Sequence, residues 1–395
     1  MDNLTHSLLG AALGEVARPR RASGSSRRVF VVSGVLAANL PDLDLLYTGI
    51  TPPPLGYLLH HRGHTHTLVG LLVQMAALAA VYRFLPPVRR LLPDERVRLW
   101  VLISVGLLSH LMLDAGNSYG VHPFFPFDSR WYYGDAVFIL EPWLWLLLGV
   151  PVAWMAPRVA RVALLVFMAV LPLGLSRAGV VPPGAVGALL ATGLVFAWGL
   201  SRLSSRARTW TGMGASVAFV GVLFGLSHVA RGETRRLLGS ARRSEILDVV
   251  LTPDPANPLC WSVIVVERDQ GAGEYALHPG TLSVAPAWLA PTACASHRFG
   301  GPRPYRMVDG RLALYEDIRQ PLEILRALQE RDCAVKAWLQ FGRAPRLVDG
   351  EIVDLRFDRG GDNFTAMGLR AGPEAAICPP HLTRWEPPRA DLLAR

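Results

Sequence analysis

The chain has 395 residues, of which 51% are hydrophobic and only 18% are charged, and its formal net charge is +9. Soluble proteins usually carry about 25% charged residues, so this composition argues against a disordered chain and an ordinary cytosolic enzyme. Repeats and sustained heptads are absent, which excludes collagen and coiled coils. The net charge could indicate nucleic-acid binding, but no basic helix, zinc finger or aromatic-basic sheet motif occurs. We therefore expect no nucleic-acid partner.

Apolar runs recur through the first 230 residues, each close to the roughly 20 residues that cross a bilayer. They cover residues 29–48, 67–84, 99–115, 136–156, 159–176, 183–200 and 212–230. A shorter run at 4–17 is predicted to form a partial or tucked helix, because it is too short to span comfortably. It lacks the basic start of a signal peptide. We predict a membrane domain at 1–230, an all-α bundle of about 7–8 transmembrane helices.

The positive charge is concentrated in this apolar half, which contains 18 arginines and 10 acidic residues. Most of these arginines lie in alternate short loops, and such loops are typically cytoplasmic. This pattern predicts that the chain beyond residue 230 lies outside the cytoplasm. The fifteen arginines of the predicted cytoplasmic loops are Arg18, Arg20, Arg21, Arg27, Arg28, Arg83, Arg89, Arg90, Arg96, Arg98, Arg158, Arg161, Arg202, Arg206 and Arg208.

Residues 231–395 change character and predict a small extramembrane α+β domain. Strands are expected at 246–251, 262–267, 334–341 and 351–357, hairpin turns at 308–310 and 348–350, and an amphipathic helix at 321–331. All four cysteines of the chain lie here: Cys260, Cys294, Cys333 and Cys378. In an extracytoplasmic domain they could form two disulfides by any of three pairings, and free buried thiols are the alternative.

Histidines and carboxylates gather at the ends of apolar runs that face the predicted outer side. Ionisable groups at such positions are costly and usually functional. Asp42 and Asp44 follow a helix-breaking proline, while His110 and Asp114 share one helical face at i and i+4. Taken alone, the Asp42 and Asp44 pair could be a polar helix cap, and the His110 and Asp114 pair could be a buried hydrogen bond. The outer set is His6, Asp42, Asp44, His60, His61, His64, His66, His110, Asp114, His122, Asp128, Asp135 and Glu141.

Mixed histidine and carboxylate ligands favour a divalent metal, zinc first, with manganese or iron as alternatives. A spare carboxylate, Asp44 or Asp114, could then handle a proton, and Arg62 could steady developing negative charge. Glu141 interrupts an apolar run and Asn117 follows Asp114 by about one turn, so both are additional candidates. Three residues of the loop rich in Pro, Phe and Tyr, namely His122, Asp128 and Asp135, are interpreted as surface residues.

Four short segments of the first 120 residues form a pattern typical of a known protein family. They are 1–6 with Gly10, 41–44, 61–66, and 110–114 with Asn117, Tyr119 and Gly120. Together they resemble the membrane-bound metal-dependent hydrolases of the YdjM type, inner-membrane proteins of which one is linked to LexA regulation. The first 150 residues carry most of this similarity. Segment 257–261 resembles the start of the C-terminal domain in a longer subgroup. The family has aspartate before a proline where this chain has Glu141.

The resemblance implies a multi-pass protein of the bacterial cytoplasmic (inner) membrane with a metal site and hydrolase activity. It points to His6, Asp42, Asp44, His61, His66, His110 and Asp114 as metal ligands. His60 and His64 fall at positions where the family pattern does not require histidine. We therefore predict a metal-dependent hydrolase at the outer membrane face that acts on a lipid-linked or small-molecule ester or phosphoester, with membrane lipids as partners. The alternative is a non-enzymatic scaffold or a metal or proton transporter.

Overall fold

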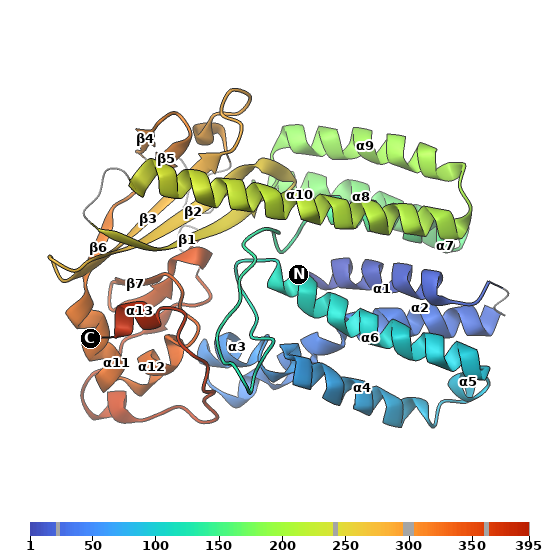
Figure 1. Cartoon of the computed structure of the whole chain (residues 1–395), viewed down its shortest axis with the longest axis horizontal. Helices are drawn as coiled ribbons and strands as arrows, with labels where there is room; N and C mark the ends of the chain where they lie inside the picture. Colours follow the sequence, from blue (N-terminus) through green and yellow to red (C-terminus); the bar gives the residue numbers. More distant parts are fainter. Residues whose placement is uncertain (21–23, 240–243, 295–303, 359–362, 395) are drawn as a thin grey trace.

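The computed structural model describes residues 1–20, 24–239, 244–294, 304–358 and 363–394, and Arg21 lies outside this part (Figure 1). Helices dominate the first 239 residues, and antiparallel sheets with short helices follow. The helices of the first part are α1 Asn3–Ala17, α2 Gly24–Asn39, α3 Leu55–His60, α4 Leu68–Tyr82, α5 Pro86–Arg89, α6 Pro93–Ala115, α7 Pro142–Met155, α8 Arg158–Arg177, α9 Pro183–Ser201 and α10 Ser205–Gly239, with 3-10 segments η1 Leu40–Ile50 and η2 His64–His66.

In the described part, five segments are long and apolar enough to cross a membrane: α2 with η1, α6, α8, α9 and α10. A sixth results if α3 to η2 and α4, which meet at a bend of 70°, form one broken span. The predicted count of 7–8 is therefore not confirmed. The difference comes from α1 and α7, which have 15 and 14 residues, because a helix rises only about 1.5 Å per residue. Glu141 caps α7, so the apolar run at 136–156 becomes helical only from Pro142.

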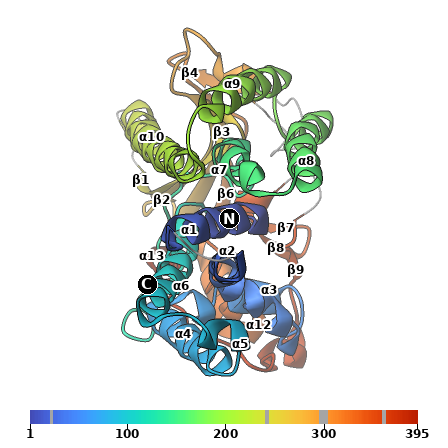
Figure 2. The same cartoon turned by 90° about the vertical axis from the view of Figure 1, so that its right-hand side faces the viewer.

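The helices lie alongside one another, and α1 occupies a central position when the bundle is viewed from its end (Figure 2). Most of α1 is buried against α2, α6, α7 and α10. Two glycines allow its closest crossing, because a Cβ atom at Gly10 would overlap the backbone of Gly34, and the reverse. Small residues permit such close approach between membrane helices. The short N-terminal helix is thus a core element of the bundle.

Two antiparallel sheets build the C-terminal part, one in the order β1-β2-β3-β5-β4 with β6 also on β3, the other in the order β7-β8-β9. The hairpins predicted at 308–310 and 348–350 are confirmed by the pairs β4/β5 and β7/β8. Their strands are β1 Glu245–Asp254, β2 Asn257–Asp269, β3 Glu274–Ser283, β4 Arg306–Val308, β5 Leu312–Leu314, β6 Ile318–Pro321, β7 Pro345–Val348, β8 Glu351–Asp354 and β9 Met367–Gly368.

The helix predicted at 321–331 is present as α11 Leu322–Arg331, but the strand expected at 334–341 is wrong. That segment forms α12 Cys333–Trp338, because the Asp332 carboxylate caps it by accepting from the backbone N–H groups of Ala334 and Val335. The final short helix is α13 Ala390–Leu393. The cysteines form two disulfides, Cys260–Cys294 and Cys333–Cys378, rather than free thiols.

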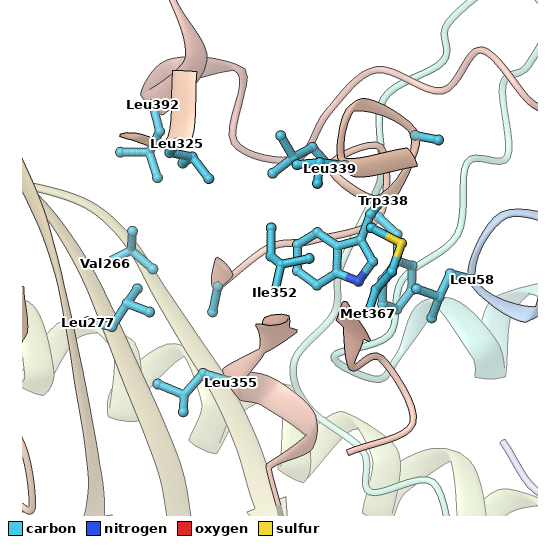
Figure 3. Close-up of a cluster of buried hydrophobic side chains, with 14 of the residues drawn as sticks. Leu58, Val266, Leu277, Leu325, Trp338, Leu339, Ile352, Leu355, Met367 and Leu392 are labelled. Atoms are coloured by element: carbon cyan, nitrogen blue, oxygen red, sulfur yellow. The ribbon is translucent and has the colours of Figure 1, made fainter. Parts of the chain in front are cut away.

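The C-terminal domain is packed against one end of the bundle. Leu58 of α3 enters the same hydrophobic core as Trp338 and Met367 (Figure 3). The indole N–H of Trp385 donates to the carbonyl oxygen of Leu59 at 3.0 Å. The C-terminal end of α1, the loop before α10 and helix α5 lie at the opposite end (Figure 1).

A buried ion cluster joins the same two parts and corrects the surface interpretation of Asp135. This carboxylate is fully buried and accepts from both terminal nitrogens of Arg343, at 2.8 and 2.9 Å, and from Arg231 at 2.7 Å. Arg343 also binds Asp248 of β1 at 2.8 Å. Arg231 and Arg343, the partners of Asp135, lie about 100 and 200 positions further along the chain. A sequence pattern among neighbouring residues cannot reveal such partners. His122 is likewise buried.

We expect Asp135→Ala to destabilise the protein by about 3–5 kcal/mol, because removing one member of a buried ion cluster leaves the others uncompensated. Asp128→Ala is the matched control, since its ion pair with Arg130 lies at the surface, where ion pairs contribute little to stability. Denaturant unfolding in mixed micelles measures both. Equal small losses in the two variants would contradict a structural role for the cluster.

Candidate metal centre

Three separate segments bring histidine and carboxylate side chains to one point at the end of the bundle that faces the C-terminal domain. Proline at position 41 ends the α-helical hydrogen bonding of α2, and the chain continues as the 3-10 segment η1, which carries Asp42 and Asp44. The short segment η2 carries His66. Helix α6 presents His110 and Asp114 on one face, as the i, i+4 spacing requires.

Four of these residues place one donor atom each around a common centre: Asp42, His66, His110 and Asp114. The Nε2 atoms of His66 and His110 are 3.0 Å apart. Each Nε2 lies 3.5 Å from Oδ1 of Asp42, and they lie 3.2 and 3.6 Å from Oδ2 of Asp114. Metal–ligand bonds of about 2.0–2.1 Å in a tetrahedron give ligand–ligand edges of roughly 3.3–3.4 Å. The four atoms therefore fit the ligand shell of a small divalent metal.

Hydrogen bonds on the far side of each imidazole fix which nitrogen faces the centre. Nδ1 of His110 donates to the carbonyl oxygen of Ala38 at 2.7 Å, and Nδ1 of His66 lies 3.2 Å from Oδ2 of Asp44. In a neutral ring, the opposite Nε2 then carries a lone pair. Two lone pairs thus meet at 3.0 Å beside two carboxylates. The lone pairs and the carboxylates repel one another unless a cation lies between them. The contacts of Nδ1 with Ala38 and Asp44 are the outer-sphere support typical of metal-bound histidine.

A second group of donor atoms, Asp42, Asp44 and His61, shares Asp42 with the first. Oδ1 of Asp44 lies 3.0 Å from Nδ1 of His61. Its Oδ2 accepts from the backbone N–H of Arg62 and the hydroxyl of Thr65, both at 2.8 Å. Both oxygens of Asp44 are therefore already engaged. The geometry favours Asp44 as the residue that orients His61 and His66.

Arg62 connects this region to Asp114. Its backbone adopts a positive φ of 59°, which turns its N–H toward Asp44. The buried guanidinium places Nε 2.9 Å from Oδ2 of Asp114, and Nη1 donates to Oδ1 of Asn117 at 2.9 Å. The guanidinium carbon also lies 4.7 Å from the ring centre of Tyr119. Arg62 thus offsets part of the negative charge of the cluster and holds Asp114 in place.

His6 lies against the cluster without belonging to either donor group. Its ring stacks on that of His110 with 3.8 Å between centres, and Nε2 is 3.4 Å from Oδ1 of Asp114. The same Oδ1 accepts from the α-amino group of Met1. Both ring nitrogens of His6 are buried and lack a hydrogen-bond partner in the described structure.

The remaining histidine candidates lie outside both groups. His60 contacts the Thr51 hydroxyl at 2.8 Å, and His64 lies beside the ring of Trp385, with 5.0 Å between centres. His122 stacks on the same ring of Trp385, with 3.8 Å between centres. Burial lowers the pKa of His122 to about 3. The sequence did not single out Thr65 or the Ala38 carbonyl. Thr65 lies inside the histidine motif and could have been noticed, whereas a backbone carbonyl leaves no trace in a sequence.

Glu141 also lies outside both donor groups and caps α7, where it accepts from the backbone N–H of Trp143 at 3.2 Å. Burial raises its pKa to about 8, and the nearby Asp2 adds to the rise. An unfolded glutamate ionises near pH 4.3. Between these values the folded state retains a proton that the unfolded state has lost, so stability should fall as pH rises, by about 1.4 kcal/mol per unit.

Glu141→Gln should therefore flatten the decline of thermal stability between pH 5 and pH 8, and the variant should exceed the wild type most at pH 8. The amide keeps the oxygen that caps α7 and carries no charge to bury. Thermal unfolding in detergent at several pH values tests this expectation. A wild-type protein with no pH dependence, or a variant with the same slope, would contradict the buried position of Glu141.

Comparison with known proteins gives a family for the part of the chain that holds the cluster. Residues 1–180 match the family model of the YdjM inner membrane protein. A Bacillus subtilis relative described as "Uncharacterized protein YfhP" is 26% identical over 150 residues, which cover 37% of this chain and 43% of the relative. The match thus spans less than half of that protein. No solved structure shows significant similarity to the chain.

Proposed function

We propose that this chain, which belongs to the YdjM inner membrane protein family through residues 1–180, is a membrane-bound metal-dependent hydrolase. The observation that carries the proposal is the meeting of two imidazole lone pairs and two carboxylates at the spacing of a tetrahedral ligand shell. Such a site needs a cation, and four protein side chains each offer it one donor atom. The bond attacked is an ester or phosphoester.

In this proposal His66, His110, Asp42 and Asp114 hold the metal, with zinc the first candidate because of the mixed nitrogen and oxygen donors. A divalent ion that binds water as well as these four side chains would lower the pKa of that water toward neutrality and would polarise a carbonyl or phosphoryl oxygen. Manganese and iron accept the same donors. The Ala38 carbonyl and the Asp44 carboxylate accept from Nδ1 of His110 and His66, which keeps both imidazoles in the binding tautomer.

The other polar residues divide the remaining work. His61 and Asp44 face each other at 3.0 Å, and an imidazole oriented by a carboxylate is the usual arrangement for moving a proton. We assign the proton transfer to His61 and the orientation of its ring to Asp44. Arg62 neutralises Asp114 from one side and limits the negative charge that builds up near the substrate.

We also propose that the cluster and the C-terminal domain lie on the extracytoplasmic side. They occupy the same end of the bundle, and the arginine-bearing loop before α10 and helix α5 lie at the other end (Figure 1), as cytoplasmic segments would. The two disulfides fit an oxidising compartment. Polar groups that gather at one end favour an enzyme over a transporter, whose site is expected near mid-membrane.

A panel of bacterial lipid extracts and small ester and phosphoester substrates tests the activity. The wild-type protein should hydrolyse at least one member, a chelator should abolish this hydrolysis, and added metal should restore it. His64→Ala should retain the activity, because His64 lies outside both donor groups, whereas His110→Ala should lose it. A metal-loaded wild type that hydrolyses nothing on the panel would favour the scaffold alternative.

A further inference from the structure

A groove of about 600 Å³ lies on the side of the bundle, between α2 and the segment that joins α4 to α6. Helix α2 contributes Val29, Val32 and Leu36 to its walls, and the segment after α4 contributes Leu85 and Val88. It lies beside α5, at the end of the bundle opposite the C-terminal domain (Figure 1). The groove is therefore separate from the candidate metal centre. Helices α2 and α4 both belong to candidate membrane spans, so we expect it to face the bilayer.

The walls of the groove are apolar and accessible. Val32, Leu36 and Leu85 keep 54%, 47% and 39% of their surface exposed. Two hydroxyl groups also belong to the lining residues, but those of Ser33 and Tyr82 are buried and bind each other at 2.9 Å. Because these hydroxyls satisfy each other, the groove suits a hydrocarbon chain better than a polar ligand. A chain that fills it also gains the dispersion contacts that an unfilled apolar groove lacks.

A single charged residue, Arg28, is found among those that line the groove in the described structure. Its side chain is exposed and has no ion pair or hydrogen bond with the described residues. The adjacent Arg27 differs, because it pairs with Glu15 at 3.3 Å. Glu95 contacts α2 through the hydroxyl of Ser26 at 3.1 Å but does not line the groove. An unpaired arginine beside an apolar groove is complementary to a lipid with a negative head group.

Two more arginines extend the positive charge next to the groove. Arg89 and Arg90 directly follow Val88 of the groove wall, and their exposed side chains also lack a partner among the described residues. This charge disfavours a second copy of the chain as the occupant. In a symmetric dimer the same face meets itself, so the unpaired arginines of both copies would be brought together, and like charges across an interface are unfavourable.

We propose that this groove binds one anionic phospholipid of the bilayer. An acyl chain lies against Val29, Val32 and Leu36, and Arg28 binds the phosphate of the head group. In the topology proposed above, this end of the bundle is cytoplasmic, so the lipid belongs to the inner leaflet. The site is independent of the proposed hydrolase function, because it shares no residue with the candidate metal centre.

Native mass spectrometry of the full-length protein in detergent tests the proposal, with phosphatidylglycerol and phosphatidylcholine of identical acyl chains as probes. The wild type should bind phosphatidylglycerol more tightly. Arg28→Gln should weaken this binding about fivefold, the effect of one arginine near an anionic lipid, and leave phosphatidylcholine binding unchanged. Arg98→Gln is its matched control, because Arg98 is exposed on α6 and does not line the groove. Val32→Trp should weaken binding of both lipids by filling the groove, whereas Leu194→Trp on the exposed face of α9 should not.

Equal binding of the two lipids to the wild type, or equal losses in Arg28→Gln and Arg98→Gln, would overturn the assignment of an anionic head group to Arg28. Unchanged lipid binding in Val32→Trp would place the lipid elsewhere and overturn the site. A dimer that binds no lipid and that Val32→Trp dissociates would assign the groove to a second copy of the chain, which also overturns the proposal. These readouts need neither bound metal nor turnover, so they do not depend on the hydrolase proposal.

Discussion

His66→Ala is expected to leave the purified protein without stoichiometric metal, whereas the wild type should retain one divalent ion per chain. His66 provides the donor atom that lies closest to the others, with Nε2 3.0 Å from His110 and 3.2 Å from Asp114. Without it, one imidazole and two carboxylates remain, and a four-coordinate site loses one corner. Elemental analysis of protein purified in detergent, without added chelator, measures the effect directly.

A graded series makes this prediction specific to the cluster. Asp44→Asn removes the charge and one of the two acceptor oxygens with which Asp44 orients His61 and His66 and should lower metal affinity about 10- to 100-fold. His64→Ala, two positions away in the same motif, should leave the metal content unchanged because His64 lies outside both donor groups. Equal metal content in the wild type, His66→Ala and His64→Ala would show that the cluster holds no ion. Loss in His64→Ala alone would place the ion elsewhere.

Much of the arrangement at the bundle end follows from local rules that can be applied to a sequence. The i, i+4 spacing of His110 and Asp114 puts both on one face of any helix, and the proline before Asp42 disrupts the α-helical hydrogen bonding there. The different surroundings of Asp42 and Asp44 could not be predicted. They depend on the 3-10 geometry of η1 and on Thr65 and the Arg62 backbone, which belong to a different segment.

A long-range partner and a local cap account for two expectations that were wrong. Asp135 lies in a loop rich in Pro, Phe and Tyr that favours a surface interpretation, yet it is buried against Arg343, more than 200 residues away. The segment at 334–341 contains residues typical of strands, but one capping carboxylate, Asp332, makes it helical. The cysteine pairing joins Cys260 of β2 to Cys294, and Cys333 of α12 to Cys378, across separate segments. Periodicity reflects neighbours along the chain, whereas the burial of Asp135 and the cysteine pairing depend on neighbours in space.

Gly34→Ala is expected to cause a large loss of folded protein, because α1 and α2 cross where neither has a side chain. A methyl group at Gly34 would overlap the carbonyl oxygen of Gly10, and backbone atoms cannot rotate away. Relief requires the helices to separate. Overpacking typically costs about 1–3 kcal/mol and occasionally more, and here it acts at the contact that allows close helix packing.

The separation should also reach the metal centre, because both helices lead into it. Helix α1 carries His6, which stacks on His110, and α2 continues into the segment with Asp42. We expect Gly34→Ala to show a lower melting temperature in detergent and reduced metal content. Gly221→Ala in α10 is the matched control, since a Cβ atom there meets nothing within 4 Å. Wild-type stability and metal content in both alanine variants would contradict the prediction. The close crossing would then not position α1 and the segment that carries Asp42.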